Sequence, residues 1–154
     1  MIFSRDGRII KKRVEEYVTF LRSFYDGNNL SLQELCNDAG IQLLQDRFIS
    51  NAWAFQFEDG PRGVVYDPTL PTLPLFYTLT KKVSHHLLRH FEREAPIYLA
   101  EQEAHYFAAA LLNTPLLTLR CIHAPKWYSL FITQGMIKNY LTDHYSLQKK
   151  PILL

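Results

Sequence analysis

Residues that could do chemistry gather in the segment Thr78–His90, which reads TLTKKVSHHLLRH. On a helix, side chains four residues apart lie on the same face, as Lys81 and His85 do here, and as His86 and His90 do on another face. In the zinc-protease motif HExxH, two histidines at this spacing bind the metal and the glutamate is the general base. Residues 81–85 of this chain read KKVSH instead. The segment therefore indicates a metal site, an altered metal site or an ordinary helix rich in histidine.

A second candidate is an acidic residue on the next helical segment. One stripe of a helix over residues 96–112 contains Leu99, Glu103, Phe107 and Ala110 or Leu111. A carboxylate in the middle of an apolar stripe needs a partner or a metal, because burying it alone is costly. We interpret nearby Glu101 as a solvated or capping carboxylate.

Two segments resemble the ImmA/IrrE family of zinc-peptidase-like proteins. The chain reads VVYDPTLPTLPLFYTLTKKVSHHLLRH and then, after a spacer, EQEAHYFAAALLNTP. The family pattern is a strand, a proline-containing loop, FTLAHELGHHLLH, a spacer and EEEANxFAxxLLMP. The resemblance runs from about Val64 to Pro115, and it continues more weakly through Phe131, Ile132 and Thr133. It implies a single minimal zincin-like domain over residues 1–154.

The departures from this pattern decide the activity that the resemblance implies. Lys81 stands at the position of the first zinc histidine, Lys82 at that of the general-base glutamate and Ser84 at that of a helix glycine. His85 and Glu103 remain as a vestigial pair of metal ligands. A catalytic zinc uses about three protein ligands and a base that takes the proton from its water. We therefore expect no catalytic residue and no cofactor, with the Lys81 ammonium paired to Glu103 in place of a metal.

Other roles for the histidines stay open. The alternative to an inactive protein is an active zinc metallopeptidase with a rebuilt ligand set, drawn from His85, Glu103 and one of His86, His90 or His105. His105 lies two residues from Glu103 and could join that set only if the helix turned. Without a metal, we expect His85 in the core, bonded to Glu103 or to the backbone. We expect His86 and His90 on a surface face of the helix.

The resemblance implies an inactive pseudo-peptidase that regulates by binding a protein partner, for example a helix-turn-helix transcriptional repressor of a mobile element or phage. The groove beside the sheet would be the binding surface, and a partner peptide could add a strand to the sheet edge. Two rival interpretations are a nucleic-acid-binding module using the basic segment Arg5–Arg13, and an engineered inactive form in which Lys81 and Lys82 replace a natural HExxH.

The remaining elements must position these residues. Hydrophobic spacing and capping signals predict helices over 8–26, 75–91, 96–112, about 125–131 and 133–143, and a short helix that opens at the capping box Ser31–Glu34 and closes at Gly40. Strands are predicted at 41–45, 53–58 and 64–66, with Trp53, Phe55 and Phe57 on the core side and one wet face, and residues 67–74 form a loop. This order predicts an α+β fold in which a small antiparallel sheet packs against several helices.

Composition supports a folded domain and excludes some partners. The 154 residues are 47% hydrophobic and 21% charged, which is enough apolar material for one core. The net charge of +2 argues against nucleic acid as the main partner, and no apolar run could span a membrane. Cys36 and Cys121 are far apart and the start of the chain does not resemble a signal peptide, so we expect a cytoplasmic protein with free, buried thiols.

Overall fold

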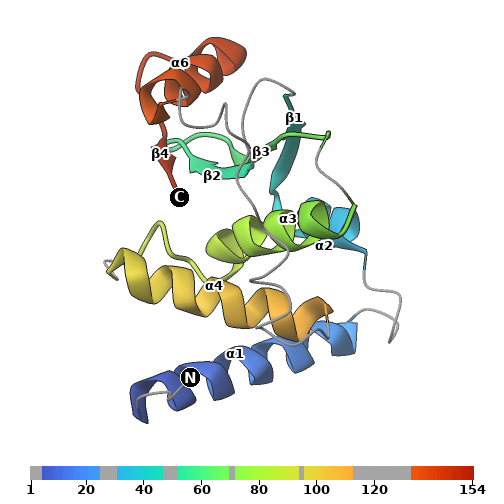
Figure 1. Cartoon of the computed structure of the whole chain (residues 1–154). Coiled ribbons are helices and arrows are strands. Elements are labelled where there is room, and N and C mark those ends of the chain that lie inside the picture. Colours follow the sequence, from blue (N-terminus) through green and yellow to red (C-terminus); the bar gives the residue numbers. More distant parts are fainter. Residues whose placement is uncertain (1–4, 25–30, 47–51, 70–71, 94–95, 113–132) are drawn as a thin grey trace.

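The structure is a computed structural model that describes residues 5–24, 31–46, 52–69, 72–93, 96–112 and 133–154 (Figure 1). These residues form, in chain order, α1 (Arg5–Phe24), α2 (Leu32–Ala39), β1 (Gln42–Gln45), β2 (Ala52–Gln56), β3 (Arg62–Tyr66), α3 (Thr72–Leu87), α4 (Ile97–Leu112), α6 (Gln134–Tyr145) and β4 (Ile152–Leu153). The predicted α+β fold is confirmed. The helix expected at about 125–131 and Cys121 lie outside the described residues.

The four strands form one sheet in the order β1-β3-β2-β4. β2 and β3 are an antiparallel pair, and β4 pairs antiparallel with the other edge of β2. β1 pairs parallel with β3, so the sheet is mixed and only its β3-β2-β4 part has the expected antiparallel pairing. The reason is strand order: β1 and β2 follow each other in the chain but are not neighbours in the sheet, because β3 lies between them.

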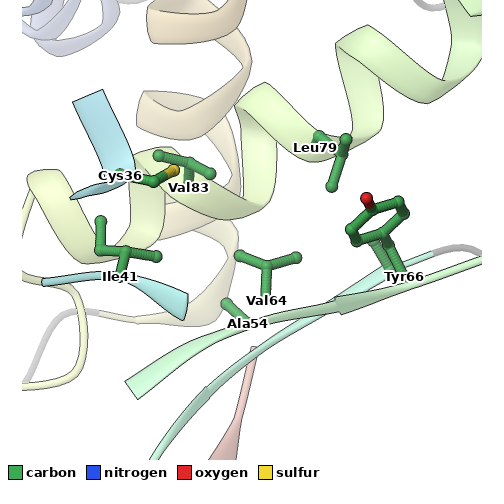
Figure 2. Packing of buried hydrophobic residues seen from close by; sticks show 8 residues of the cluster. Cys36, Ile41, Ala54, Val64, Tyr66, Leu79 and Val83 are labelled. Carbon is green, nitrogen blue, oxygen red and sulfur yellow. The ribbon is translucent and has the colours of Figure 1, made fainter. Parts of the chain in front are cut away.

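Helices cover both faces of the sheet. On one face, side chains of β2 and β3 pack under α2 and α3 in a cluster of Cys36, Ile41, Ala52, Ala54, Val64, Tyr66, Leu79 and Val83. Figure 2 shows Ala54 and Val64 pointing from the strands toward Val83. On the other face, Phe55, Phe57 and Val65 pack against Ile137 and Leu141 of α6. The expected wet face on β2 is therefore wrong, because α6 covers the side that α3 leaves free, whereas the core positions of Phe55 and Phe57 are confirmed.

The remaining helices stack below α3, as Figure 1 shows: α4 packs on α3 and α1 packs on α4. Val14 and Val18 of α1 bury against Tyr106 and Phe107 of α4. Arg22 donates to the carbonyl oxygens of Ala110 and Leu111, at 2.9 and 2.7 Å. A guanidinium at this end of a helix satisfies otherwise free carbonyls and complements the helix dipole, so α1 holds α4 in place.

Capping residues set several helix ends as the sequence predicts. The Ser31 hydroxyl accepts a hydrogen bond from the backbone N–H of Glu34, and Gly40 closes α2 in the left-handed conformation at φ 67°. Thr133 is the N-cap of α6 and accepts from the N–H of Met136. None of the described helices is both long and apolar enough to cross a membrane.

Helix α3 begins and ends earlier than expected, and its end shapes the site. Pro74 is accepted in the first turn because that turn needs no backbone donor. At the other end Arg89 adopts φ 61°, its N–H donates to the carbonyl of His86, and the N–H of His90 donates to the carbonyl of His85 at 2.9 Å. This pair of bonds is a Schellman motif. It turns the chain so that His90 comes back beside His85.

Candidate functional site

The site is built where α3 faces the first turns of α4. Lys81 Nζ lies 2.5 Å from Glu101 Oε2, and the Nε2 atom of buried His85 lies 3.1 Å from Glu101 Oε1. Lys81 and His85 are one turn apart on α3, so a single carboxylate from α4 reaches both. Lys81 is therefore paired, but its partner is Glu101 and not Glu103 as expected.

Helix geometry explains why the expected acid is the wrong one. Glu101 and Glu103 are two residues apart on α4, which separates their directions by about 200° around the axis. Only one of them can face Lys81 and His85. The apolar stripe correctly indicates that Glu103 is buried, but it does not say which neighbour lies opposite. Glu101, interpreted from sequence as a solvated carboxylate, is the acid in contact with Lys81.

Glu103 has partners of its own from the turn after α3. His90 Nε2 lies 2.8 Å from Glu103 Oε2, and Arg93 donates to the same carboxylate through Nη1 at 3.1 Å and Nη2 at 3.4 Å. The Glu103 side chain is only 9% exposed. Its buried negative charge is thus compensated without a metal, as burial requires.

The two carboxylates are linked through the two histidines. The Nδ1 atoms of His85 and His90 are 2.8 Å apart, so one donates to the other. His85 Nε2 lies 3.1 Å from Glu101 Oε1, so a proton on this nitrogen points at an acceptor, whereas a lone pair there would face a negative charge. In its neutral form His85 therefore carries its proton on Nε2 and accepts at Nδ1 from His90.

Charges around the site favour this neutral form of His85. Burial, reinforced by the Lys82 charge and opposed by Glu101, lowers the pKa of His85 to about 4. Burial also raises the pKa of Glu101, but contacts with His85 and Lys81 outweigh it and hold that pKa below the ordinary range. Glu101 is therefore an anion at neutral pH, with the Lys81 ammonium as its counter-ion.

Lys82, at the position of the general base in the family pattern, turns to the sheet and not to the carboxylate. Its Nζ lies 5.4 Å from the centre of the Trp53 ring on β2. Burial, with a smaller contribution from Lys81, lowers its pKa to about 8, against the opposing effect of Glu101. At neutral pH Lys82 is therefore mostly an ammonium, which has no lone pair to take a proton from water as the glutamate of the family pattern does.

The other histidines are engaged elsewhere. His86 donates from Nε2 to the carbonyl of Gly63 at 2.7 Å and stacks on Phe91. His105 contacts the hydroxyl of Tyr77 and stacks on its ring. The surface position expected for His86 and His90 is wrong, because both are buried. Within the described ranges, no three His, Cys, Asp or Glu side chains gather to hold a metal ion.

The buried His86 predicts a pH dependence of stability. Burial lowers its pKa from 6.5 to about 4 in the folded state, although the bond to Gly63 opposes the change. The unfolded chain therefore binds more protons between these pH values, so stability should fall as pH drops from about 6.5 to 4, by on the order of 3 kcal/mol for this group. Urea unfolding at several pH values measures it. His86→Gln keeps a donor for Gly63 but does not titrate, so its profile should be flatter; parallel profiles would contradict this assignment.

No protein-family model matches the chain, and neither a curated protein nor a solved structure matches it significantly. The resemblance to the ImmA/IrrE family thus rests on the residues quoted above.

Proposed function

We propose that this protein is a catalytically inactive relative of ImmA/IrrE zinc peptidases that works as a regulatory, protein-binding module. The observation that carries the proposal is the contact between the Lys81 ammonium and Glu101, whose other oxygen faces the Nε2 of His85. A peptidase of this kind would bring a zinc ion to such a carboxylate and imidazole. Here a lysine of the same chain supplies the positive charge.

The residues present do not fit a catalytic zinc ion. Two potential ligand atoms, His85 Nε2 and Glu101 Oε1, lie side by side, but the third ligand position is held by an ammonium that repels a divalent cation. The rebuilt ligand set is not favoured either. His86 and His105 are bonded to other groups, and His90 meets His85 through Nδ1, on the side of the ring opposite Glu101.

The second part of the proposal is the partner. A zinc-peptidase fold without its metal keeps a groove and a sheet edge that can hold a peptide in extended form. A transcriptional repressor of a mobile element or phage, acting in the cytoplasm, is the partner that the family resemblance favours. The protein would then bind such a repressor without cutting it.

Restoring the motif tests the inactive-site proposal. The Lys81→His, Lys82→Glu variant, purified without chelators, should bind about one zinc per chain, whereas the parent should bind none. The structure supplies a matched pair of controls on the same helix. Adding Glu101→Gln to the restored variant should abolish zinc binding, whereas adding Glu103→Gln should leave the stoichiometry unchanged.

Two results would count against the proposal. One is a parent chain that carries stoichiometric zinc and hydrolyses peptides. The other is a folded restored variant that binds no zinc. Peptide cleavage by the restored variant, with a metal-free parent, would instead favour the alternative that the chain is an inactivated form of an active peptidase.

A further inference from the structure

The outer edge of β2 is covered by a short segment from the same chain. Leu153 lies opposite Phe55 and Ile152 opposite Gln56. Leu154 and Ala54 exchange two backbone hydrogen bonds, each 2.9 Å long. Figure 1 shows this segment beside β2, with the C-terminus pointing toward α3 and α4. The segment is thus bound as one added antiparallel strand.

Its side chains occupy two apolar positions on opposite faces of the sheet. Leu153 is buried with Phe55, Phe57 and Val65 under α6. Leu154 packs against the cluster that contains Ala54 and Val83 under α3. Ile152 is 58% exposed. Two leucines therefore anchor the strand while the position before them faces solvent.

The attachment is small compared with the rest of the sheet. β4 has two residues and pairs with only part of β2, whereas β3 pairs with β2 along five residues. The chain leading to it is exposed over residues 146–150, and Pro151, directly before the strand, is buried. A short edge strand at the end of an exposed segment opens at a lower free-energy cost than the sheet itself.

We propose that the β2 edge is a strand-addition site for an extended apolar peptide of a partner protein, and that residues 151–154 cover it in cis. The inference rests on the proposed protein-binding function and names its surface. The bound segment defines the partner chemistry: a strand with two adjacent leucine-sized side chains, one for each face, preceded by a solvent-facing residue. Backbone hydrogen bonds to β2 would supply the affinity for the peptide, and the two apolar positions would select its side chains.

A labelled peptide tests the site. The probe is fluorescein-Lys-Lys-Pro-Ile-Leu-Leu, the sequence of residues 149–154. Leu153→Asp should release the cis strand, because a carboxylate cannot enter the apolar position under α6. Fluorescence polarisation should show this variant binding the probe at least about tenfold more tightly than the parent, in which the tethered strand competes at high effective concentration. A probe with both leucines replaced by aspartate should not bind.

A disulfide can lock residues 151–154 onto the β2 edge. Gln56→Cys with Ile152→Cys joins residues that lie opposite each other in the ladder, at a separation that a disulfide can bridge. The oxidised form should bind no probe, and reduction should return it to the parent level. Each single-cysteine variant controls for the native thiols.

Native hydrogen exchange tests the same point without a substitution. The amides of Ala54 and Leu154 should exchange at least about tenfold faster than those of the β2-β3 ladder, because the cover opens alone. Equal protection, or a folded Leu153→Asp variant that does not bind the probe, overturns the inference. The inference would also be overturned if the parent formed concentration-dependent dimers and the Leu153→Asp variant did not. The strand bound at the β2 edge would then come from a second copy of this chain. Zinc binding by the parent would instead contradict the proposed function and leave the strand-addition site untouched.

Discussion

Gly63→Ala should destabilise the protein by about 3 kcal/mol, because there is no room for a side chain at this point of β3. A Cβ placed on Gly63 would lie 2.9 Å from the carbonyl carbon of Gln42 on β1 and 3.0 Å from the Phe55 ring, and closer still to the Gln42 carbonyl oxygen. The first neighbour is backbone, so β1 would have to move away from β3. The carbonyl of Gly63 also accepts the hydrogen bond from His86, so the shift would reach α3.

Urea unfolding measures the loss, and Gly135→Ala is the matched control. Among the described residues, a Cβ at Gly135, in the first turn of α6, meets only the Thr133 hydroxyl oxygen, at 3.7 Å. Alanine is the better helix former, so this variant should be unchanged or up to about 1 kcal/mol more stable. Similar stability changes in the two variants would mean that the sheet accommodates a side chain between β1 and β3.

Local signals in the sequence predicted most of the fold. The capping residues Ser31 and Thr133, the left-handed Gly40 and the alternation at Phe55 and Phe57 each act within a few residues, so the sequence alone is enough to read them. Strand β4 could not be found in this way. Its two residues, Ile152 and Leu153, are too few to show a periodic pattern, and they form a strand only because they pair with the edge of β2.

The candidate site was harder to predict because it depends on how α3 and α4 face each other. The chain reverses at Arg89, which has no glycine signal for its positive φ, so the sequence suggested a longer helix with His90 on its surface. Similarly, Glu101 and Glu103 are equivalent by type and near neighbours along the chain. Only the relative rotation of the two helices assigns Glu101 to Lys81 and Glu103 to His90.

Glu103→Gln should destabilise the protein by about 2–3 kcal/mol at neutral pH, since hydrogen bonds to a buried charge are among the stronger ones. Glu103 Oε2 accepts from both His90 and Arg93 Nη1, and Oε1 accepts from Arg93 Nη2. An amide oxygen in the place of Oε2 keeps the first two bonds without the negative charge, but the amide N–H groups then face the donor Arg93 Nη2. The exposed Glu92, 3.7 Å from Arg89, gives the control: Glu92→Gln should change stability by less than about 0.5 kcal/mol.

The pH dependence separates this charge effect from a simple packing defect. Burial raises the pKa of Glu103, but the bonds from His90 and Arg93 outweigh it and lower the pKa below 4.5 in the folded state. The charged form therefore stabilises the fold above pH 4.5, and this contribution is lost as pH falls through the lowered pKa. The difference between parent and Glu103→Gln should shrink on acidification; a constant difference would indicate lost packing instead.

The same substitution tests whether the buried histidines orient the site. When His85 binds a metal through Nε2, its proton must lie on Nδ1, where His90, which contacts Glu103, can accept it. In the Lys81→His, Lys82→Glu background, Glu103→Gln should keep one zinc per chain but weaken its affinity about tenfold, as expected when a partner behind a ligand histidine is lost. Glu101→Gln should remove binding altogether. Equal zinc affinity with and without Glu103→Gln would mean that His85 is oriented by its helix alone.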